Sequence, residues 1–248
     1  MKLYYPHATA NKTILDMPAN EMIAYLQMQF NHVENGTEFS DKAKLKNEFK
    51  LLTDESEETR NDGLIPKNLE MIRDGIADQL TIAYFLAFKV NGFIFEPVEL
   101  DLPAPKSYTE YCEGTEATIK ALKAACFEED DIAQADALLN KLIAQLYLVP
   151  EFCAFDVDFD LIDITFSSLS KICTATEDLT AEQVAEQTLN KYQERGYKAE
   201  IQKTSAGFGI FVSEDCEIKG KIVPKGKFLK SLFLLDPILA DVKEESVW

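Results

Sequence analysis

Acidic side chains at helical spacing occupy two consecutive stretches of the chain. Glu55 and Glu58 are three residues apart, and Glu70, Asp74 and Asp78 follow at intervals of four, so each set shares one face of a helix. Two antiparallel helices joined by a short turn bring such faces opposite each other. Carboxylate oxygens are the ligands that Mg²⁺ and Mn²⁺ prefer. The spacing therefore predicts a divalent-cation site formed by Glu55, Glu58, Asp74 and Asp78.

A second interpretation, in which these carboxylates are solvated helix faces, competes with the first. In a chain this acidic, pairs at helical spacing arise often by chance. Two features of the second stretch favour the metal site. Asp78 lies among the apolar residues Ile76, Ala77 and Leu80, an unusual setting for a charge that merely faces water. Gly75 costs a helix interior about 1 kcal/mol relative to alanine, which indicates close approach of another backbone or of a ligand.

The elements that position these carboxylates follow from the apolar periodicity. The pattern predicts a first helix over residues 20–33 and a second that begins after Ser40. The Asn61-Asp62-Gly63 sequence predicts the end of the second helix, at about residue 60. Pro66 opens a third helix, which ends at Asn91-Gly92. The acidic stretches thus belong to the second and third helices.

The remainder of the chain divides into helices and a short β segment. Residues 93–115 contain several prolines and a glycine and are expected to be irregular. Thr180 and Gln183 form a capping-box signature. Helices are predicted over residues 116–126, 131–148 and 157–173, and from Thr180 to Gly196. Residues 197–202 and 208–212 are β-prone and flank a turn, which predicts a hairpin.

These elements predict a mainly α fold. A helical bundle over residues 1–176 carries the metal site, and residues 177–248 add a helix and a small β-hairpin appendage. A length of 248 residues suits one structural domain overall.

Composition restricts the function classes. The formal net charge of −18 disfavours binding to nucleic acid polymers and anionic membranes. No apolar run reaches the roughly 20 residues of a membrane span, and the N-terminus lacks a signal-peptide pattern. The five cysteines are widely spaced, and the two histidines lie outside any motif, which disfavours a disulfide framework or a histidine zinc site. We expect a cytoplasmic protein.

Lysines are the second set of side chains with a candidate role. For each of these lysines, a role in phosphate binding competes with an ordinary role on the protein surface. Lys171 lies on a largely apolar helix, where it either contacts a triphosphate or extends its stem along apolar surface to reach water. Five lysines also fall within twelve residues, at positions 219, 221, 225, 227 and 230. They either capture phosphate, contact a neighbouring subunit, or keep an exposed hairpin or tail soluble.

The acidic sequences resemble a known motif. Asp54-Glu55-Ser56-Glu57-Glu58 and Asp74-Gly75-Ile76-Ala77-Asp78-Gln79-Leu80 are similar to the paired carboxylate motif of the all-alpha NTP pyrophosphohydrolases. That superfamily includes MazG, dimeric dUTPases and phosphoribosyl-ATP pyrophosphohydrolase. The strict MazG form has Glu where Gly75 stands, whereas an Asp one residue earlier, as here, is typical of the phage-type branch. Residues 167–171 and 226–231 are similar to further segments of that branch, with Ser168 in place of its Asn.

The resemblance, which covers most of residues 40–235, implies an all-helical bundle and a Mg²⁺-dependent reaction, with Mn²⁺ as an alternative. A nucleoside triphosphate would be split into monophosphate and pyrophosphate. Glu55, Glu58, Asp74 and Asp78 would be both metal ligands and catalytic residues, and Asp54 or Glu57 would be the general base. The substrate-binding residues implied are Ser168, Lys171, Lys227 and Lys230.

The resemblance also implies a homodimer or homotetramer, and the host cytoplasm as the workplace if the chain is phage-encoded. Two alternatives stay open. The same fold acts on dUTP, phosphoribosyl-ATP or an alarmone, or the chain is a non-enzymatic acidic helical interaction protein.

Overall fold

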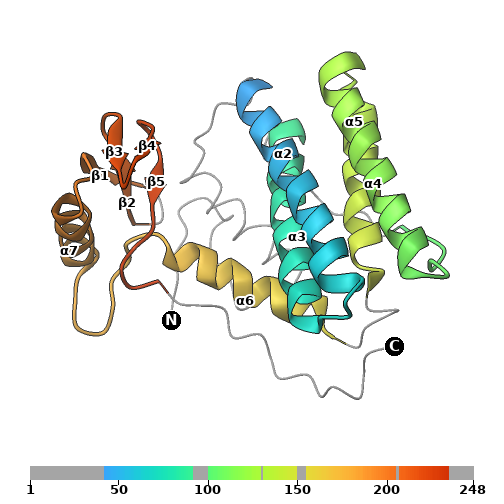
Figure 1. Cartoon of the computed structure of the whole chain (residues 1–248), viewed down its shortest axis with the longest axis horizontal. Coiled ribbons are helices and arrows are strands. Elements are labelled where there is room, and N and C mark those ends of the chain that lie inside the picture. Colours follow the sequence, from blue (N-terminus) through green and yellow to red (C-terminus); the bar gives the residue numbers. More distant parts are fainter. Residues whose placement is uncertain (1–41, 92–99, 130, 150–154, 205–206, 235–248) are drawn as a thin grey trace, which may run out of the picture. The chain divides into compact units, whose positions relative to one another are not determined.

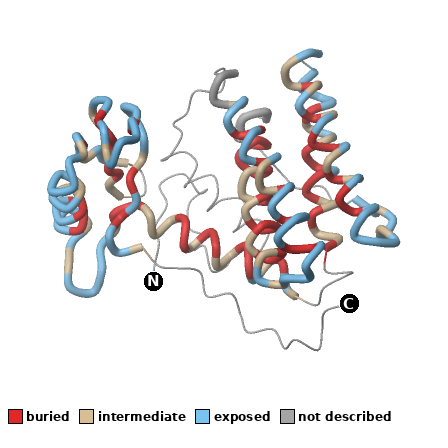
Figure 2. The backbone as a smooth tube through the Cα atoms, in the orientation of Figure 1, coloured by how far each residue is buried: buried red, intermediate tan, exposed pale blue. Residues whose placement is uncertain are grey.

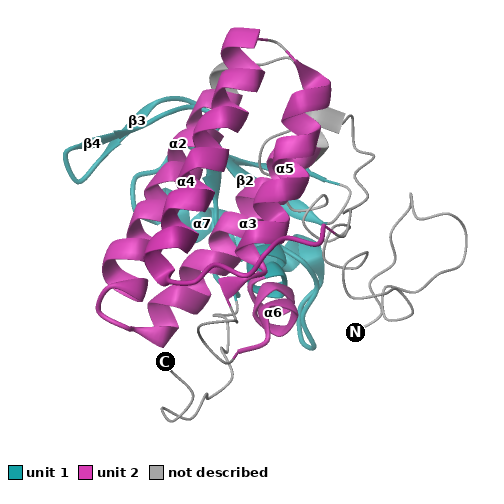
Figure 3. Ribbon diagram, turned by 90° about the vertical axis from the view of Figure 1, so that its right-hand side faces the viewer, with its two compact units in different colours: residues 1–18, 29–37, 165–237 teal, residues 19–28, 38–164, 238–248 magenta. Residues whose placement is uncertain are grey.

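The structure is a computed structural model that describes residues 42–91, 100–129, 131–149, 155–204 and 207–234. The helix predicted over residues 20–33 lies outside this range. The chain is mainly helical, with a small antiparallel sheet near the C-terminus. No helix in the described part is long and apolar enough to cross a membrane. The chain forms two compact units that divide between Ile164 and Thr165 (Figure 3), whereas the sequence places a boundary at residue 176.

The first unit along the described chain, magenta and labelled unit 2 in Figure 3, is a bundle of helices, and the second is the teal part labelled unit 1. α2 (Lys42–Glu58), α3 (Leu69–Asn91), α4 (Tyr108–Ala124) and α5 (Ile132–Leu146) lie side by side, and α6 (Val157–Ser170) runs across one end of them (Figure 1). α3 packs against both α2 and α5, and α4 packs against α5 and α2. The buried residues form a continuous stripe along the inner faces of these helices (Figure 2). Its fully buried members include Leu52, Ile72, Leu80, Leu122 and Leu139.

The connection between α2 and α3 differs from the prediction. The Asn61-Asp62-Gly63 sequence does not end the helix, because the chain continues through a π-helical segment, η2 (Thr59–Leu64). Its wide turn is marked by the Ile65 N–H, which donates to the Arg60 carbonyl at 2.9 Å. A left-handed Lys67, at φ 62°, then reverses the chain. α3 begins at Leu69 rather than at Pro66, and this short connection makes α2 and α3 neighbours.

The prediction of irregular structure over residues 93–115 is wrong from Tyr108 onward. α4 begins there because the Ser107 hydroxyl accepts a hydrogen bond from the Glu110 N–H and caps the helix. Gly114 lies inside α4, where a Cβ would be 3.3 Å from Nε2 of Gln145, so its small size serves helix packing and not a turn. α4 continues into a second π-helical segment, η3 (Ala125–Glu129).

The second unit packs a helix against strands. The predicted capping box is confirmed, with Thr180 and Gln183 bonded reciprocally at the start of α7 (Ala181–Glu194). The predicted hairpin is also confirmed as β1 (Ala199–Lys203) and β2 (Phe208–Val212), which pair antiparallel. α7 packs on both strands.

Three further short strands complete this unit, and the sequence did not predict them. β5 (Phe228–Leu229) pairs with the other edge of β2, and β3 (Cys216–Ile218) pairs with β4 (Lys221–Val223) in a separate hairpin. α6 ends at Ser170 and not at Cys173, because the backbone of Cys173 pairs with Phe208 in an antiparallel bridge.

Candidate functional site: the carboxylates of α2 and α3

The charges of Glu58, Asp74 and Asp78 act on Glu55 across α2 and α3, and we call these four predicted metal ligands the carboxylate cluster. Glu55, Asp74 and Asp78 are half-buried, whereas Glu58 is exposed at the end of α2. Burial raises the pKa of Glu55 to about 7, with further contributions from the negative charges of Asp78, Glu58, Asp74 and Asp54. Two helices therefore bring together the carboxylates that the spacing selected.

Burial and the negative charges of this cluster together bring the pKa of Glu55 near neutral pH. Burial and the charge of Glu70 also raise the pKa of Asp74. A cation bound among these oxygens would favour the ionised form of each carboxyl group, because opposite charges at close range stabilise each other. The donor set is therefore chemically suited to a hard divalent cation.

An interlock around Gly75 sets the relative position of the two helices. The Thr59 hydroxyl donates to the carbonyl of Glu55 at 2.7 Å and accepts from Nε2 of Gln79 at 2.8 Å. Gln79 also donates to the carbonyl of Gly75 at 3.2 Å. A Cβ on Gly75 would lie 2.1 Å from Oγ1 of Thr59, so only glycine permits this contact. The close approach predicted from Gly75 is confirmed, but its partner is the side chain of Thr59 and not the backbone or ligand that the sequence indicated.

The α3 residues of this interlock directly follow two acidic residues of the carboxylate cluster. Gly75 follows Asp74 directly, and Gln79 follows Asp78 directly. On α2, Thr59 lies one turn beyond Glu55 and bonds to its carbonyl. The contacts that hold the two helices together are therefore adjacent in sequence to the carboxylates, and they fix how far one acidic stripe is shifted along the other.

A buried ion pair anchors α3 to α6 beside the cluster. The guanidinium of Arg73 donates from Nε to Oδ2 of Asp160 at 2.6 Å and from Nη2 to Oδ1. Both side chains are almost fully buried. Helical spacing did not predict this pair, although a signal existed: Arg73 falls on the same apolar stripe of α3 as Leu69 and Ile76. A charge on a core-facing stripe needs a buried partner.

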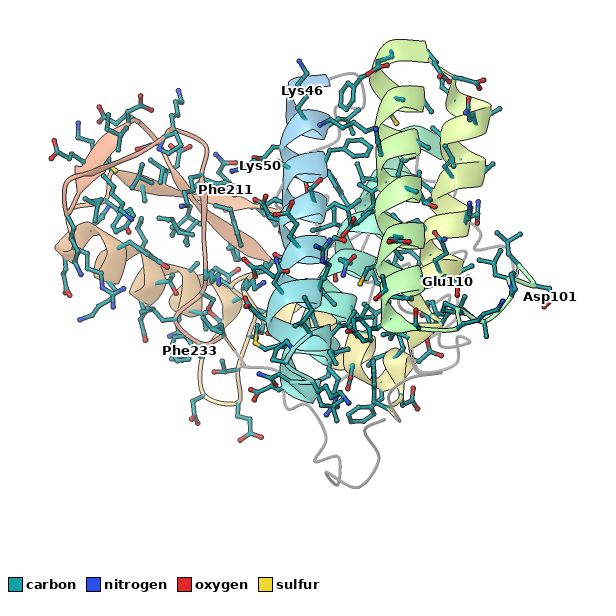
Figure 4. The ribbon with its side chains drawn as sticks, turned by 45° about the vertical axis from the view of Figure 1, so that its right-hand side comes forward. Lys46, Lys50, Asp101, Glu110, Phe211 and Phe233 are labelled. Carbon is teal, nitrogen blue, oxygen red and sulfur yellow. The ribbon has the colours of Figure 1, made fainter. Side chains whose placement is uncertain are left out.

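The two candidate general bases differ in position. Asp54 is half-exposed, contributes to the field at Glu55, and forms an i,i+4 ion pair with Lys50 at 3.8 Å. Lys46 and Lys50 lie along the exposed side of α2 (Figure 4). Glu57 instead lines a pocket between α2 and α4. Asp54 is therefore the candidate associated with the carboxylate cluster.

The predicted substrate-binding residues belong to the second unit. Nζ of Lys171 donates to the buried hydroxyl of Ser168 at 3.4 Å, and the Lys171 carbonyl accepts from the N–H of Ser231 at 2.8 Å. Ser231 follows Lys230 directly, so Ser168, Lys171 and Lys230 belong to one hydrogen-bonded region. Lys227 precedes β5 and is exposed.

The five lysines between residues 219 and 230 are all exposed. Lys219, at φ 50°, and Gly220, at φ 78°, form the turn between β3 and β4. This placement on a hairpin and on the segment leading to β5 is compatible with phosphate binding and with a purely solubilising role.

Within the residues that the structure describes, no three histidine, cysteine, aspartate or glutamate side chains are arranged as a preassembled set of metal ligands. No family model, curated protein or solved structure matches the chain at a significant level. The likeness to the pyrophosphohydrolases is therefore carried by the acidic sequences of α2 and α3 and by residues 167–171 and 226–231.

Proposed function

We propose that this chain is a Mg²⁺-dependent nucleotide pyrophosphohydrolase of the all-helical kind. It would cleave a nucleoside or deoxynucleoside triphosphate between the α- and β-phosphates and so act on the nucleotide pool. The observation that carries the proposal is the electrostatic coupling of Glu55 to Glu58, Asp74 and Asp78 across two neighbouring helices. The mainly helical fold supports it.

In this mechanism Glu55, Glu58, Asp74 and Asp78 hold the cation. Mg²⁺ held by these residues would supply positive charge for the triphosphate and Lewis acidity to activate water. Glu55, whose pKa is raised to about 7, would have to be ionised to act as a ligand, so cation binding would favour its deprotonated form. Asp54, at the half-exposed edge of the cluster, accepts the proton of the attacking water. Mn²⁺ is the expected substitute.

In the second unit, we propose Ser168, Lys171, Lys227 and Lys230 as phosphate-binding residues. Lys171 and Lys230 are joined through the Ser231 hydrogen bond, and Ser168 holds the ammonium group of Lys171. Lys227 adds a further exposed positive charge. We further propose a homodimer or homotetramer, and NTP or dNTP as substrate, with dUTP, phosphoribosyl-ATP and alarmones as the alternatives to be compared.

A non-enzymatic acidic interaction protein is the second candidate. The lack of a preassembled ligand set in the described residues favours it. In that case the carboxylates are solvated and Glu55 relieves their repulsion by keeping its proton.

Product analysis separates these functions. Purified protein is incubated with Mg²⁺ or Mn²⁺ and a panel of nucleotides, and the products are resolved by ion-exchange chromatography. Monophosphate and pyrophosphate from any substrate support the proposal. Diphosphate and orthophosphate retain a metal site but exclude this mechanism. No product from any nucleotide with either metal favours the interaction protein.

Substitution of a ligand tests the site itself. Loss even of a group that only orients ligands lowers metalloenzyme activity by about 10- to 100-fold, so Asp78→Asn should lower kcat/KM by at least about 100-fold. Asp101→Asn is the matched control, because Asp101 is exposed in the segment before α4 (Figure 4). Equal losses in both variants would argue against a role for Asp78.

A further inference from the structure

α2 and α4 enclose a pocket of about 360 Å³ that the proposed reaction does not use. Thr53, Glu57 and Arg60 contribute from α2 and η2, and Glu116, Lys120 and Lys123 contribute from α4. Both sets repeat at intervals of four and three residues, so each is a single helix face. The pocket is therefore a groove between two facing stripes of polar side chains.

Positive charge predominates in this groove, although the chain as a whole carries −18. Nη1 of Arg60 contacts Oε1 of Glu116 across it at 2.7 Å, and this bond raises the pKa of the guanidinium. Lys120 and Lys123 form no ion pair with any other described residue. Glu57 is the remaining acidic group. Three cations thus face two carboxylates, and two of the cations lack a fixed counterion.

The dimensions and polarity indicate the class of ligand. A volume near the lower end of the roughly 300–1,000 Å³ typical of ligand pockets suits a mononucleotide-sized molecule. The ammonium groups of two lysines one turn apart suit the oxygens of a single phosphate group, which accept strong charge-assisted hydrogen bonds. The hydroxyl of Thr53 and the amide of Asn61, which also lines the pocket, offer neutral hydrogen bonds.

We propose that this groove is a binding site for the phosphate group of a small phosphorylated molecule, separate from the carboxylate cluster. Lys120 and Lys123 hold the phosphate, and Arg60, kept in place by Glu116, borders it. No divalent cation takes part, because the ligand's charge is met by side chains of the protein. The inference does not depend on the proposed hydrolysis.

Binding is tested on the full-length protein in EDTA, which removes any contribution of a metal. Inorganic phosphate and AMP are titrated separately by isothermal titration calorimetry. Saturable binding of both with equal affinity identifies the phosphate group alone as the ligand. Tighter binding of AMP identifies a phosphate ester whose remaining part also contacts the groove. The absence of saturable binding for both at millimolar concentration overturns the proposal.

Variants locate the binding. The double substitution Lys120→Ala and Lys123→Ala should weaken it by at least about tenfold, the loss expected for one charge-assisted hydrogen bond. Lys141→Ala, at an exposed position of α5, is the control and should bind like the original chain. Circular dichroism verifies that the exposed substitutions leave the fold unchanged.

Asp78→Asn distinguishes this site from the carboxylate cluster and should keep its affinity for AMP. Unchanged affinity in the double lysine variant, or loss of affinity in Asp78→Asn alone, would overturn the assignment to this groove. Failure of hydrolysis with intact metal-free binding would contradict only the proposed function.

Discussion

Gly75 leaves no room for a side chain between α3 and the end of α2, because a Cβ would lie 2.1 Å from Oγ1 of Thr59. Alanine gains about 1 kcal/mol in helix propensity, but overpacking of a fitted contact costs about 1–3 kcal/mol. We expect Gly75→Ala to lower the free energy of unfolding, measured by urea denaturation.

Gly114→Ala is the matched control for this substitution. Its Cβ would approach only the flexible end of Gln145, at 3.3 Å, so it should be neutral or stabilising by up to about 1 kcal/mol. Equal stability of Gly75→Ala and the unsubstituted chain would contradict the interlock.

The proton on Glu55 links stability to pH. The pKa of Glu55 is raised from 4.5 to about 7, so the folded chain binds this proton more tightly than the unfolded chain does. The resulting stabilisation is fully present below pH 4.5 and is lost as the pH rises through about 7. Glu55→Gln, which stays neutral, should be more stable than the original chain above pH 7 in EDTA.

Urea unfolding over a series of pH values measures this difference. Asp101→Asn, an exposed acidic position away from the cluster, should follow the profile of the unsubstituted chain. Parallel profiles for Glu55→Gln and the unsubstituted chain would show that Glu55 ionises normally.

At the scale of the elements, α6 depends on the buried pair of Arg73 and Asp160. Removing one partner of a buried ion pair leaves an uncompensated charge, so Asp160→Asn should lower the free energy of unfolding by about 3–5 kcal/mol. Replacing both by apolar residues of similar volume, as in Arg73→Met with Asp160→Leu, should recover most of that loss.

Chemical denaturation of the three variants measures the coupling. Arg60→Ala removes an exposed ion pair, with Glu116, and should have little effect. If Asp160→Asn were as mild as Arg60→Ala, the buried pair would not hold α6.

Elements with strong local signals were predictable from the sequence. α3 and α5 follow from long apolar stripes, α7 from its capping box, and β1 and β2 from a change of period around a turn. The π-helical turn at Thr59–Leu64 was not predictable, because the Asn-Asp-Gly signal for a helix end was overridden by tertiary contacts. A Cβ on the buried Gly63 would lie 2.9 Å from Ile72, so glycine serves packing there.

The candidate site was predictable in part for the same reason. Helical spacing placed Glu55, Asp74 and Asp78 on facing stripes, and in the structure the charges of Asp74 and Asp78 are near enough to raise the pKa of Glu55. The partner of Arg73 was not predictable, because Asp160 lies 87 residues away and spacing carries no information on such pairs. The short strands β3 to β5 were also not predictable, because two or three residues are too few to show an alternation of apolar and polar side chains.

Across the two units of the molecule, a bound divalent cation should stabilise only one. The carboxylate cluster belongs entirely to the helical unit. Mg²⁺ bound to the folded state alone stabilises it in proportion to the logarithm of concentration. We expect Mg²⁺ to raise the Tm of that unit in differential scanning calorimetry at slightly alkaline pH, and Asp78→Asn to abolish the shift.

Sodium chloride of equal ionic strength is the control for this experiment. It screens repulsion between acidic side chains generally, and it should act similarly on Asp78→Asn and the unsubstituted chain. A Mg²⁺ shift no larger than that of sodium chloride would exclude specific binding.

The hydrogen bond from the Ser231 N–H to the Lys171 carbonyl, 2.8 Å long, joins the residue that follows α6 to the segment that follows β5. The 59 residues between them, 172–230, therefore form a closed loop whose two ends meet at this bond. Closure entropy grows only slowly with the length of such a loop. Additions at the exposed β3–β4 turn should thus be tolerated, and the segment from Lys171 to Ser231, whose ends are joined, is suited to transfer into another protein as a single insert.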